Sequence, residues 1–279
     1  MKLHTHTFTT DTDTGAITLF PFACVHRDNE GHSASHWREF LREVQETPNA
    51  YAIGMGDYHD FLRTHARDWV KAYPHDRNSF KTMEDWRHKE TAKFAEELAP
   101  LGSRLLGLHI GNHHYEYTTG ENDTQELCRL LGVPYLDHTC LTRLVFRRKK
   151  HNDAYCILSM LSLHGEGVGG GSSAGGDINA MINKGSGFDA DIVLMAHNHQ
   201  KNAVETTQLY LPRTGKLDLK ERNRIYVRCG CFVKGYVPSC TTYAEKNLLK
   251  PTAIGYTKIE VKFHKFHDDV RSHTFRVTV

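Results

Sequence analysis

Short runs of apolar residues, each closed by glycine or by polar residues, recur along the first 200 positions of the chain. Such runs are typical of buried β-strands, whereas apolar repeats at i, i+3, i+4 and i+7 are typical of amphipathic helices. The pattern predicts strands at 17–25, 51–53, 104–110, 154–164 and 191–196. Pro21 lies inside the first of them and favours an edge strand or a bulge, because proline donates no backbone hydrogen bond.

Helical patterns separate several of these strands. A serine at 33 or 35 can cap the first helix, whose apolar positions repeat at helical spacing: Trp37, Phe40, Leu41 and Val44. With its flanking strands this helix predicts a parallel βαβ unit. Residues 60–98 also read as helical, with a break at Pro74.

The third strand is followed by a predicted short helix that ends before Gly132. Asp123 and Glu126 are spaced as a capping box, and its buried side would consist of Leu127, Leu130 and Leu131. A further short helix can form at 177–184.

The rest of the chain reads as β-structure. Segments 141–147 and 154–164 predict a hairpin around a basic tip at 148–151, and 203–211, 224–232, 253–263 and 274–279 alternate like antiparallel strands. Cys229 and Cys231 share one face of a strand, which favours core packing over metal binding. Residues 1–15 are either a loose arm or an edge strand.

Composition fits a soluble globular protein of one domain. The chain has 279 residues, 39% of them hydrophobic and 24% charged, and a formal net charge of +2. So mild a charge gives no independent argument for a nucleic-acid partner. Seven cysteines without a C-x-x-C pair argue against a disulfide framework. Without an apolar leader or a run of about 18 apolar residues, the expected location is cytoplasmic, with no membrane partner.

The unusual feature is that five predicted strands end in side chains able to bind metals. These side chains are Cys24 and His26, Asp57, Asn112 and His113, His164, and His197 and His199. Imidazole nitrogens and carboxylates suit Zn, Mn or Fe. One strand end of this kind would be unremarkable, since most Gly-Asp pairs are turns. Five in succession predict a metal site.

In their order these strand ends resemble the motifs of the calcineurin-like metallophosphoesterase superfamily. Those motifs are D-x-H, G-D-x-x-D, G-N-H-[DE], a later strand-end histidine and G-H-x-H. The matching residues are Cys24-Val25-His26, Gly56-Asp57-Tyr58-His59-Asp60, Gly111-Asn112-His113-His114, His164 and Ala196-His197-Asn198-His199. The resemblance implies an α/β (α+β) fold of two packed β-sheets flanked by helices, a metallophosphoesterase-like four-layer sandwich. Residues 1–279 would form a single domain, with 60–100 as a helical cap insertion over the site.

The resemblance also implies a dinuclear metal centre of Mn, Zn or Fe. One divalent ion would be held by His26, Asp57 and His199, with Cys24 beside them. The second would be held by Asp57, Asn112, His164 and His197, so that Asp57 bridges the two. His113 is the candidate general acid, its alternative being a supporting or stacking role, and Asp60 would orient a ligand through a hydrogen bond.

Three positions depart from the motifs. Cys24 replaces an aspartate, and a thiolate would favour Zn or Fe(II) over Mg. It is therefore either a ligand of the first ion or a buried thiol beside a weakly occupied site. His114 replaces an acid and would affect tuning of the site, whereas Ala196 replaces a glycine at small cost if its backbone dihedrals are ordinary.

The predicted function is a hydrolase: a metal-dependent phosphoesterase, acting as a phosphodiesterase on nucleotides or nucleic acid through a metal-activated hydroxide. The alternatives are a phosphomonoesterase of the same fold and a catalytically impaired metal-binding scaffold. The basic residues at 147–150 and Arg63, Arg67 and Lys71 only suggest a nucleic-acid groove. The Gly-rich segment 165–176 is either a lid or a loop whose amides approach an anion. The substrate, the native metals and the oligomeric state stay open.

Overall fold

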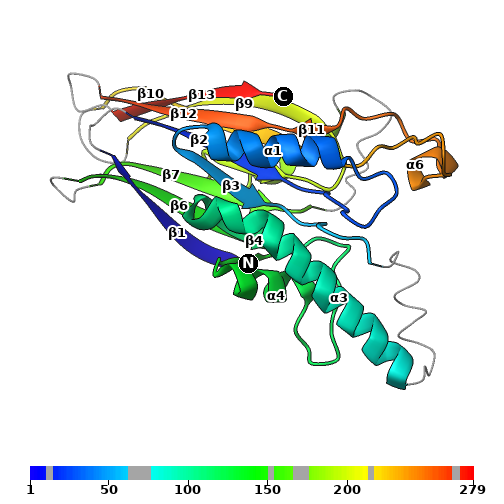
Figure 1. Ribbon diagram of the computed structural model, residues 1–279. Coiled ribbons are helices and arrows are strands. Elements are labelled where there is room, and N and C mark those ends of the chain that lie inside the picture. The colour runs from blue at the N-terminus through cyan, green and yellow to red at the C-terminus, as the bar shows by residue number, and fades with distance from the viewer. Residues whose placement is uncertain (11–14, 62–76, 150–153, 166–175, 213–216, 266–270) are drawn as a thin grey trace.

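The computed structural model describes residues 1–10, 15–61, 77–149, 154–165, 176–212, 217–265 and 271–279. Its strands form two sheets that pack face to face, and helices lie on their outer sides (Figure 1). The helices are α1 (Ala34–Glu46), α3 (Arg77–Leu98), α4 (Asp123–Leu131), α5 (Gly176–Gly185), α6 (Tyr243–Lys246) and the 3-10 helix η1 (Ala99–Arg104).

The first sheet carries the predicted βαβ unit. Its order is β13-β12-β2-β3-β4-β5, and the four strands from β2 to β5 run parallel. They are β2 (Gly15–Phe22), β3 (Ala50–Gly54), β4 (Leu105–His109) and β5 (Tyr135–Asp137). Helix α1 joins β2 to β3, as predicted. The last strands, β12 (Lys258–Lys265) and β13 (Arg271–Thr278), add to the β2 side in antiparallel fashion.

The second sheet has the order β1-β6-β7-β8-β10-β11, and β9 pairs with β10. Its strands are β1 (Lys2–Thr10), β6 (Thr139–Arg148), β7 (Ala154–Leu163), β8 (Ile192–Met195), β9 (Lys201–Tyr210), β10 (Lys220–Cys231) and β11 (Gly255–Tyr256). The predicted β6–β7 hairpin is confirmed. Strand β1 is an edge strand that runs parallel to β6. Of the two alternatives for the N-terminal segment, the edge strand is therefore the correct one and the loose arm is not.

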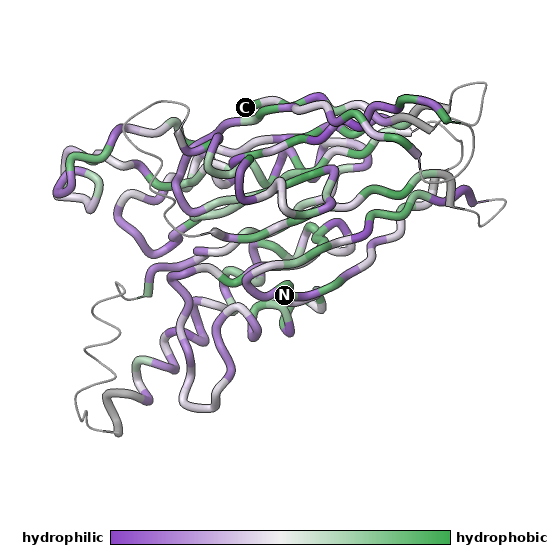
Figure 2. The backbone as a smooth tube through the Cα atoms, turned by 180° about the vertical axis from the view of Figure 1, so that it is seen from behind, coloured by the Kyte–Doolittle hydropathy of each residue, from purple (hydrophilic) through white to green (hydrophobic). Residues whose placement is uncertain are grey.

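Three apolar layers hold the sheets and helices together. One fills the space between the sheets, a second lies between the first sheet and helices α1, α3 and α4, and a third lies under α5. Hydrophobic residues follow the strands, while α3 is mainly hydrophilic along its length (Figure 2). The expected four-layer sandwich is thus confirmed. Cys229 and Cys231 are fully buried in the central layer, as predicted.

Pro21 does not mark an edge strand, and that prediction is wrong. Strand β2 lies between β12 and β3, yet β12 pairs only with the stretch from Gly15 to Leu19. The missing N–H of Pro21 therefore falls beyond the β12 ladder, where no partner strand requires it.

The capping box of α4 is shifted by one residue from its predicted place. Asn122 accepts a hydrogen bond from the backbone N–H of Gln125, and the Gln125 side chain accepts one from the backbone of Asn122. Leu127 is buried as predicted, but Leu130 is 46% exposed. The predicted stop at Gly132 is confirmed, since its φ of +66° suits glycine.

Only part of the predicted cap lies within the described residues. In α3, Phe94 and Leu98 are buried against the first sheet, so this end of the helix belongs to the main body. Residues 62–76, with Arg63, Arg67 and Lys71, lie outside the described residues, and the cap over the site stays a prediction. Among the described residues, no helix has the length and apolar character that crossing a bilayer requires.

Candidate metal centre

The metal-capable residues predicted from the sequence come together at one edge of the two sheets. Strands β2, β3 and β4 are parallel neighbours in the first sheet, and β7 and β8 are parallel neighbours in the second. Their carboxyl ends deliver Cys24 and His26, Asp57, Asn112 and His113, His164, and His197 and His199. Sites at the carboxyl ends of parallel strands are a recurring feature of α/β proteins.

Two glycines allow the strand ends to approach this closely. A Cβ on Gly111 would lie 2.0 Å from Oδ1 of Asp57. A Cβ on Gly56 would lie 2.7 Å from Nδ1 of His164, and the φ of +98° at Gly56 disfavours any other residue. The glycines of the second and third motifs are therefore required by packing around Asp57.

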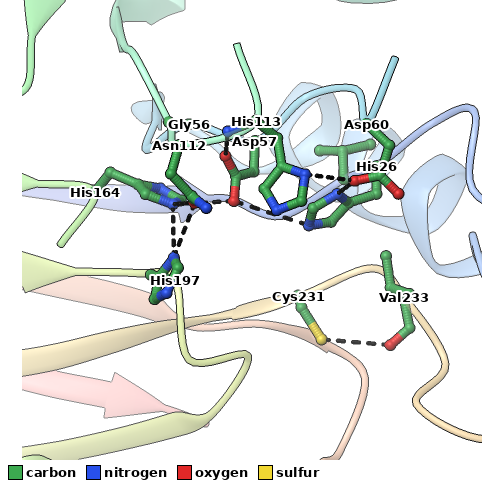
Figure 3. Close-up of polar contacts among 12 residues, drawn as sticks. His26, Gly56, Asp57, Asp60, Asn112, His113, His164, His197, Cys231 and Val233 are labelled. Atoms are coloured by element: carbon green, nitrogen blue, oxygen red, sulfur yellow. Dashed lines mark hydrogen bonds and ion pairs between the residues drawn. The ribbon is translucent and has the colours of Figure 1, made fainter. Parts of the chain in front are cut away.

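Four potential donor atoms crowd together on one side of the site (Figure 3). Nε2 of His164 lies 3.0 Å from Oδ2 of Asp57 and 3.1 Å from Oδ1 of Asn112. Nδ1 of His197 lies 3.0 Å from the same Asn112 oxygen and 3.3 Å from Nε2 of His164. Ligands at 2.0–2.2 Å from one ion stand about 3 Å apart when they meet at right angles. These distances fit the proposed ligand set of the second ion.

The hydrogen bond at the back of His164 supports this reading. Nδ1 of His164 donates to the carbonyl oxygen of Met55 at 2.5 Å. In the neutral ring, Nε2 then carries a lone pair, and that lone pair faces the carboxylate of Asp57. Two acceptors 3.0 Å apart repel each other unless a proton or a metal ion lies between them, and a backbone bond of this kind orients metal-binding histidines elsewhere.

The second group of donors centres on His26. Its Nδ1 donates to Oδ1 of Asp60 at 2.6 Å, so Nε2 is the nitrogen left for a ligand. That Nε2 is buried without a hydrogen-bond partner and lies 3.9 Å from Oδ2 of Asp57. The potential ligand atoms of His26, Cys24 and His199 all lie within 4.8 Å of one another. Oδ2 of Asp57 thus stands near both groups, as a bridging oxygen would.

Asp60 ties His113 to the same network. Its Oδ1 lies 2.8 Å from Nδ1 of His113 as well as 2.6 Å from Nδ1 of His26. The backbone N–H of His113 donates to Oδ1 of Asp57 at 2.9 Å. The carboxylate of Asp60 therefore fixes the orientation of two imidazoles beside Asp57.

Burial and neighbouring charges set the protonation of these groups. Burial alone would raise the pKa of Asp57, but His164, His26 and His113, in their protonated forms, together outweigh it and hold that pKa far below its usual range. Burial likewise opposes ionisation of Asp60, whose pKa is nevertheless kept far below normal by His113, His26 and Asn29 together. Burial and the nearby His26 lower the pKa of His199 to about 3. Ionised carboxylates and a neutral imidazole are the forms in which these residues bind metals.

Cys24 lies at the junction of the two groups. Its sulfur is within 4.8 Å of potential ligand atoms of Asp57 and His164, besides those of His26 and His199. The thiol is fully buried, and burial together with the Asp57 carboxylate raises its pKa well above normal. This position suits a ligand, while the raised pKa suits a neutral thiol, so both sequence-based readings stand.

Most of the predicted ligands have a left-handed backbone, which is uncommon for residues other than glycine. The positive φ angles are 49° at Cys24, 42° at His26, 57° at Asp57, 73° at His197 and 60° at His199. Such residues typically cluster at functional sites, where the surrounding structure holds them in place. Ala196 is not among them, so its dihedrals are ordinary and the loss of the motif glycine costs little.

Sequence reasoning missed several residues that support the site. Asp28 accepts hydrogen bonds from the backbone of Asp60 and Phe61, at 2.6 and 2.7 Å, and Asn29 donates to Oδ2 of Asp60 at 2.6 Å. A polar turn directly after His26 was the available signal. His114 turns away to bond the carbonyl of Gly111. The segment 166–175 and the hairpin tip at 150–153 lie outside the described residues.

Comparisons with known proteins give distant structural similarities alone. No family model and no curated protein matches the chain. Among solved structures it is similar to Vacuolar Protein Sorting 29 from Cryptosporidium parvum, with a TM-score of 0.37, 10% identity and coverage of 94% of this chain and 98% of that one. It is similar to a predicted phosphoesterase from Streptococcus pneumoniae TIGR4, with a TM-score of 0.34, 10% identity and coverage of 94% and 99%. It is also similar to Vps29 complexed with Zn²⁺ from Entamoeba histolytica, with a TM-score of 0.36, 11% identity and coverage of 94% and 99%.

These similarities are too low to transfer the role of any residue. The fold itself is of the class expected from the motifs: two packed sheets with flanking helices, and potential ligands at the carboxyl ends of their parallel strands. The resemblance to calcineurin-like metallophosphoesterases therefore holds at the level of architecture. Function has to be argued from the side chains at the site.

Proposed function

We propose that this protein is a dinuclear metal-dependent phosphoesterase, and that its substrates are phosphodiesters of nucleotides or nucleic acid. The observation that carries the proposal is the pairing of the His26 and His164 groups around one oxygen, Oδ2 of Asp57. Two-metal hydrolases place their ions about 3.5–4 Å apart around such a shared carboxylate.

The donor set fits two divalent ions. The first would be held by Cys24, His26, Asp57 and His199, and the second by Asp57, Asn112, His164 and His197. Imidazole and carboxylate donors suit Mn, Zn or Fe, and a thiolate would shift the preference of the first site toward Zn or Fe. Ions bound here would supply a hydroxide at neutral pH and offset negative charge on the phosphoryl oxygens.

His113 is the proposed general acid. Its Nδ1 lies 2.8 Å from Oδ1 of Asp60, and this contact fixes the orientation of the ring. Its backbone N–H bonds Asp57, so the imidazole is placed beside the shared carboxylate. From that position the ring can deliver a proton to a leaving alkoxide. Asp60 orients both His113 and His26 and contacts no reacting atom in this scheme.

Among the described residues, the pairing of the arginine next to His26 favours a diester over a monoester dianion. Arg27, the cationic residue next to His26, is paired with Glu97 at 2.6 Å and with Glu90 at 3.2 Å. Its charge is therefore already neutralised. The two ions would supply most of the positive charge that the phosphoryl group needs. A monoanionic diester needs less positive charge beyond these ions than a dianionic monoester does.

The test is hydrolysis of bis(p-nitrophenyl) phosphate and of p-nitrophenyl phosphate by protein reconstituted with Mn²⁺ or Zn²⁺. We expect turnover of both model compounds to require added metal, with the diester preferred in kcat/KM. Preference for the monoester would contradict the proposed substrate class. No turnover of either compound by protein carrying two ions per chain would contradict the phosphoesterase itself.

The role of His113 is tested by the leaving group. Replacing the proton donor in His113→Asn should slow release of a basic alkoxide by about 10²–10⁴-fold. The effect should be much smaller for p-nitrophenolate, which leaves without a proton. Equal losses for both leaving groups would indicate a structural or metal-positioning role for His113. The matched control is His114→Asn, which alters the adjacent imidazole that bonds Gly111 instead.

One observation favours a second candidate, a metal-binding scaffold without turnover. A fully buried thiol with a raised pKa stands where the first motif has a carboxylate. If this thiol stays protonated, the first ion binds weakly and the hydroxide is poorly activated. Elemental analysis beside the diester assay separates the candidates, since the scaffold would bind metal but fail to hydrolyse either compound.

A further inference from the structure

Arg228 on β10 is a buried cation that the proposed metal chemistry does not use. Its side chain is only 1% exposed, although arginine is almost never fully buried without a paired charge. Its guanidinium donates hydrogen bonds to two backbone carbonyls: Nη1 donates to Ala196 at 3.2 Å and Nη2 donates to Asp177 at 3.1 Å. Burial lowers the pKa of this guanidinium, and the negative charge of Asp177 opposes that effect only in part.

The two carbonyls belong to α5 and to the first residue of the last motif. Asp177 lies in the first turn of α5, and Ala196 directly precedes His197. The N–H of Ala196 donates to the carbonyl of His164 at 3.0 Å. The peptide that leads into His197 is therefore held on one side by β7 and on the other by Arg228.

The loop that follows needs this support because its backbone is strained. The N–H of Asn198 donates back to the carbonyl of Ala196 at 3.0 Å, across His197, whose φ is +73°. A two-residue hydrogen bond around a residue of positive φ is the rare and strained form of the γ-turn. His199 is also left-handed, at +60°. The Ala196 carbonyl thus closes the turn and accepts from the guanidinium, a charge-assisted bond that is stronger than a neutral one.

We propose that Arg228 is a positioning residue that clamps the His197 turn against α5 and thereby sets the affinity of the metal centre. This inference rests on the proposed metal centre and adds to it a residue that touches neither metal ligand nor substrate. Strand β10 supports the same loop at a second point, because the N–H of Gly230 donates to the carbonyl of Gln200 at 2.9 Å. His197 lies within the turn itself, so its ion depends most directly on the clamp.

The test measures metal binding by titration calorimetry with Zn²⁺ and by the visible spectrum of Co²⁺ bound in its place. Arg228→Met keeps the apolar stem and removes both hydrogen bonds, and should weaken the ion at His197 by about 10–100-fold, the usual effect of losing a residue that orients a ligand. Arg228→Lys should be intermediate, because one ammonium cannot bridge both carbonyls in the planar manner of a guanidinium. The Co²⁺ spectrum of Arg228→Met should change as the His197 ligand loses its fixed orientation.

Arg104 provides a matched control far from the centre. Its Nη1 also donates to two backbone carbonyls, those of Val44 and Gln45 at the end of α1. Arg104→Met should leave metal affinity and the Co²⁺ spectrum unchanged. A folded Arg228→Met protein that binds both ions as tightly as wild type would overturn the clamp. If that variant does not fold, wild-type affinity in Arg228→Lys would overturn it instead. Absence of metal binding by wild type would refute the metal centre itself, a result distinct from either of these.

Discussion

At the scale of single residues, the centre is held together by hydrogen bonds that assign a role to each ring nitrogen. The carbonyl of Met55 accepts a hydrogen bond from Nδ1 of His164, and the carboxylate of Asp60 accepts one from Nδ1 of His26. The two Nε2 atoms are therefore left to face Asp57. The motifs predicted that Asp60 orients a ligand, but they could not show which ring nitrogen of His26 it contacts or that the carbonyl of Met55 bonds His164. The motifs identified the residue types, whereas the hydrogen bonds formed in the fold determine which tautomer each histidine adopts.

Cys24 is the residue at which the two readings of the first site can be separated. If the thiolate binds the first ion, Cys24→Ala should weaken that ion and reduce the preference for Zn²⁺ over Mn²⁺, because a soft ligand is lost. Metal titration with each ion measures both effects. Cys229→Ala is the control, since it removes another fully buried thiol from the same apolar layer. Unchanged stoichiometry and affinity in Cys24→Ala would show that Cys24 is a core thiol.

At the scale of elements, the sequence predicted the βαβ unit, the β6–β7 hairpin and the five strand ends. Apolar runs reveal strands well, because burial dictates their composition. They could not reveal that β10 runs parallel to β8 or that the C-terminal strands divide between two sheets at Thr257. Such pairing is decided by tertiary contacts. Arg228 was missed for a related reason: a charged residue in a strand reads as solvent-facing until its partners are known.

The close approach of β3 and β4 gives a prediction at this scale. Gly111→Ala would place a methyl group 2.0 Å from Oδ1 of Asp57, so the carboxylate must move. Because Asp57 is the proposed ligand of both ions, we expect affinity for both to fall by about 100-fold or more. Calorimetric metal titration measures the loss. Gly187→Ala is the control, since its nearest neighbour would be a carbonyl at an ordinary 3.8 Å. Wild-type metal binding in Gly111→Ala would show that the ends of β3 and β4 can accommodate a methyl group without moving Asp57.

At the scale of the whole molecule, the two sheets are joined through a buried imidazole as well as through apolar packing. His109 at the end of β4 donates from Nδ1 to the carbonyl of Asp137 at 2.8 Å. Its Nε2 then accepts from the hydroxyl of Ser162, on β7 of the other sheet, at 2.8 Å. Burial, in a side chain with no exposed surface, lowers the pKa of His109 to about 4.

This neutral histidine makes the fold sensitive to acid. The unfolded chain takes up a proton at His109 near pH 6.5, whereas the folded chain takes it up only near pH 4. Between these values the unfolded state binds more protons, so the free energy of unfolding falls as the pH falls, by up to about 1.4 kcal/mol per pH unit. Urea unfolding of metal-free protein from pH 7 to pH 4 measures the slope.

The variant His109→Gln should have a lower free energy of unfolding at pH 7. Its slope of unfolding free energy against pH should also be smaller, by up to the contribution that His109 makes in wild type. His138→Gln, at an exposed position, should leave the slope as it is in wild type. An unchanged slope in His109→Gln would mean that other groups account for the acid sensitivity.

The measurement that tests the central claim most directly is metal stoichiometry, taken together with diester hydrolysis, in wild type and in Asp57→Asn. Asp57→Asn keeps the shape of the side chain and removes the charge shared by the two groups of ligands. Asp189→Asn, which alters a side chain that is 81% exposed, is the control. The account predicts two ions and turnover in wild type and in the control, with loss of both ions and of hydrolysis in Asp57→Asn. Two tightly bound ions and undiminished hydrolysis in Asp57→Asn would contradict it.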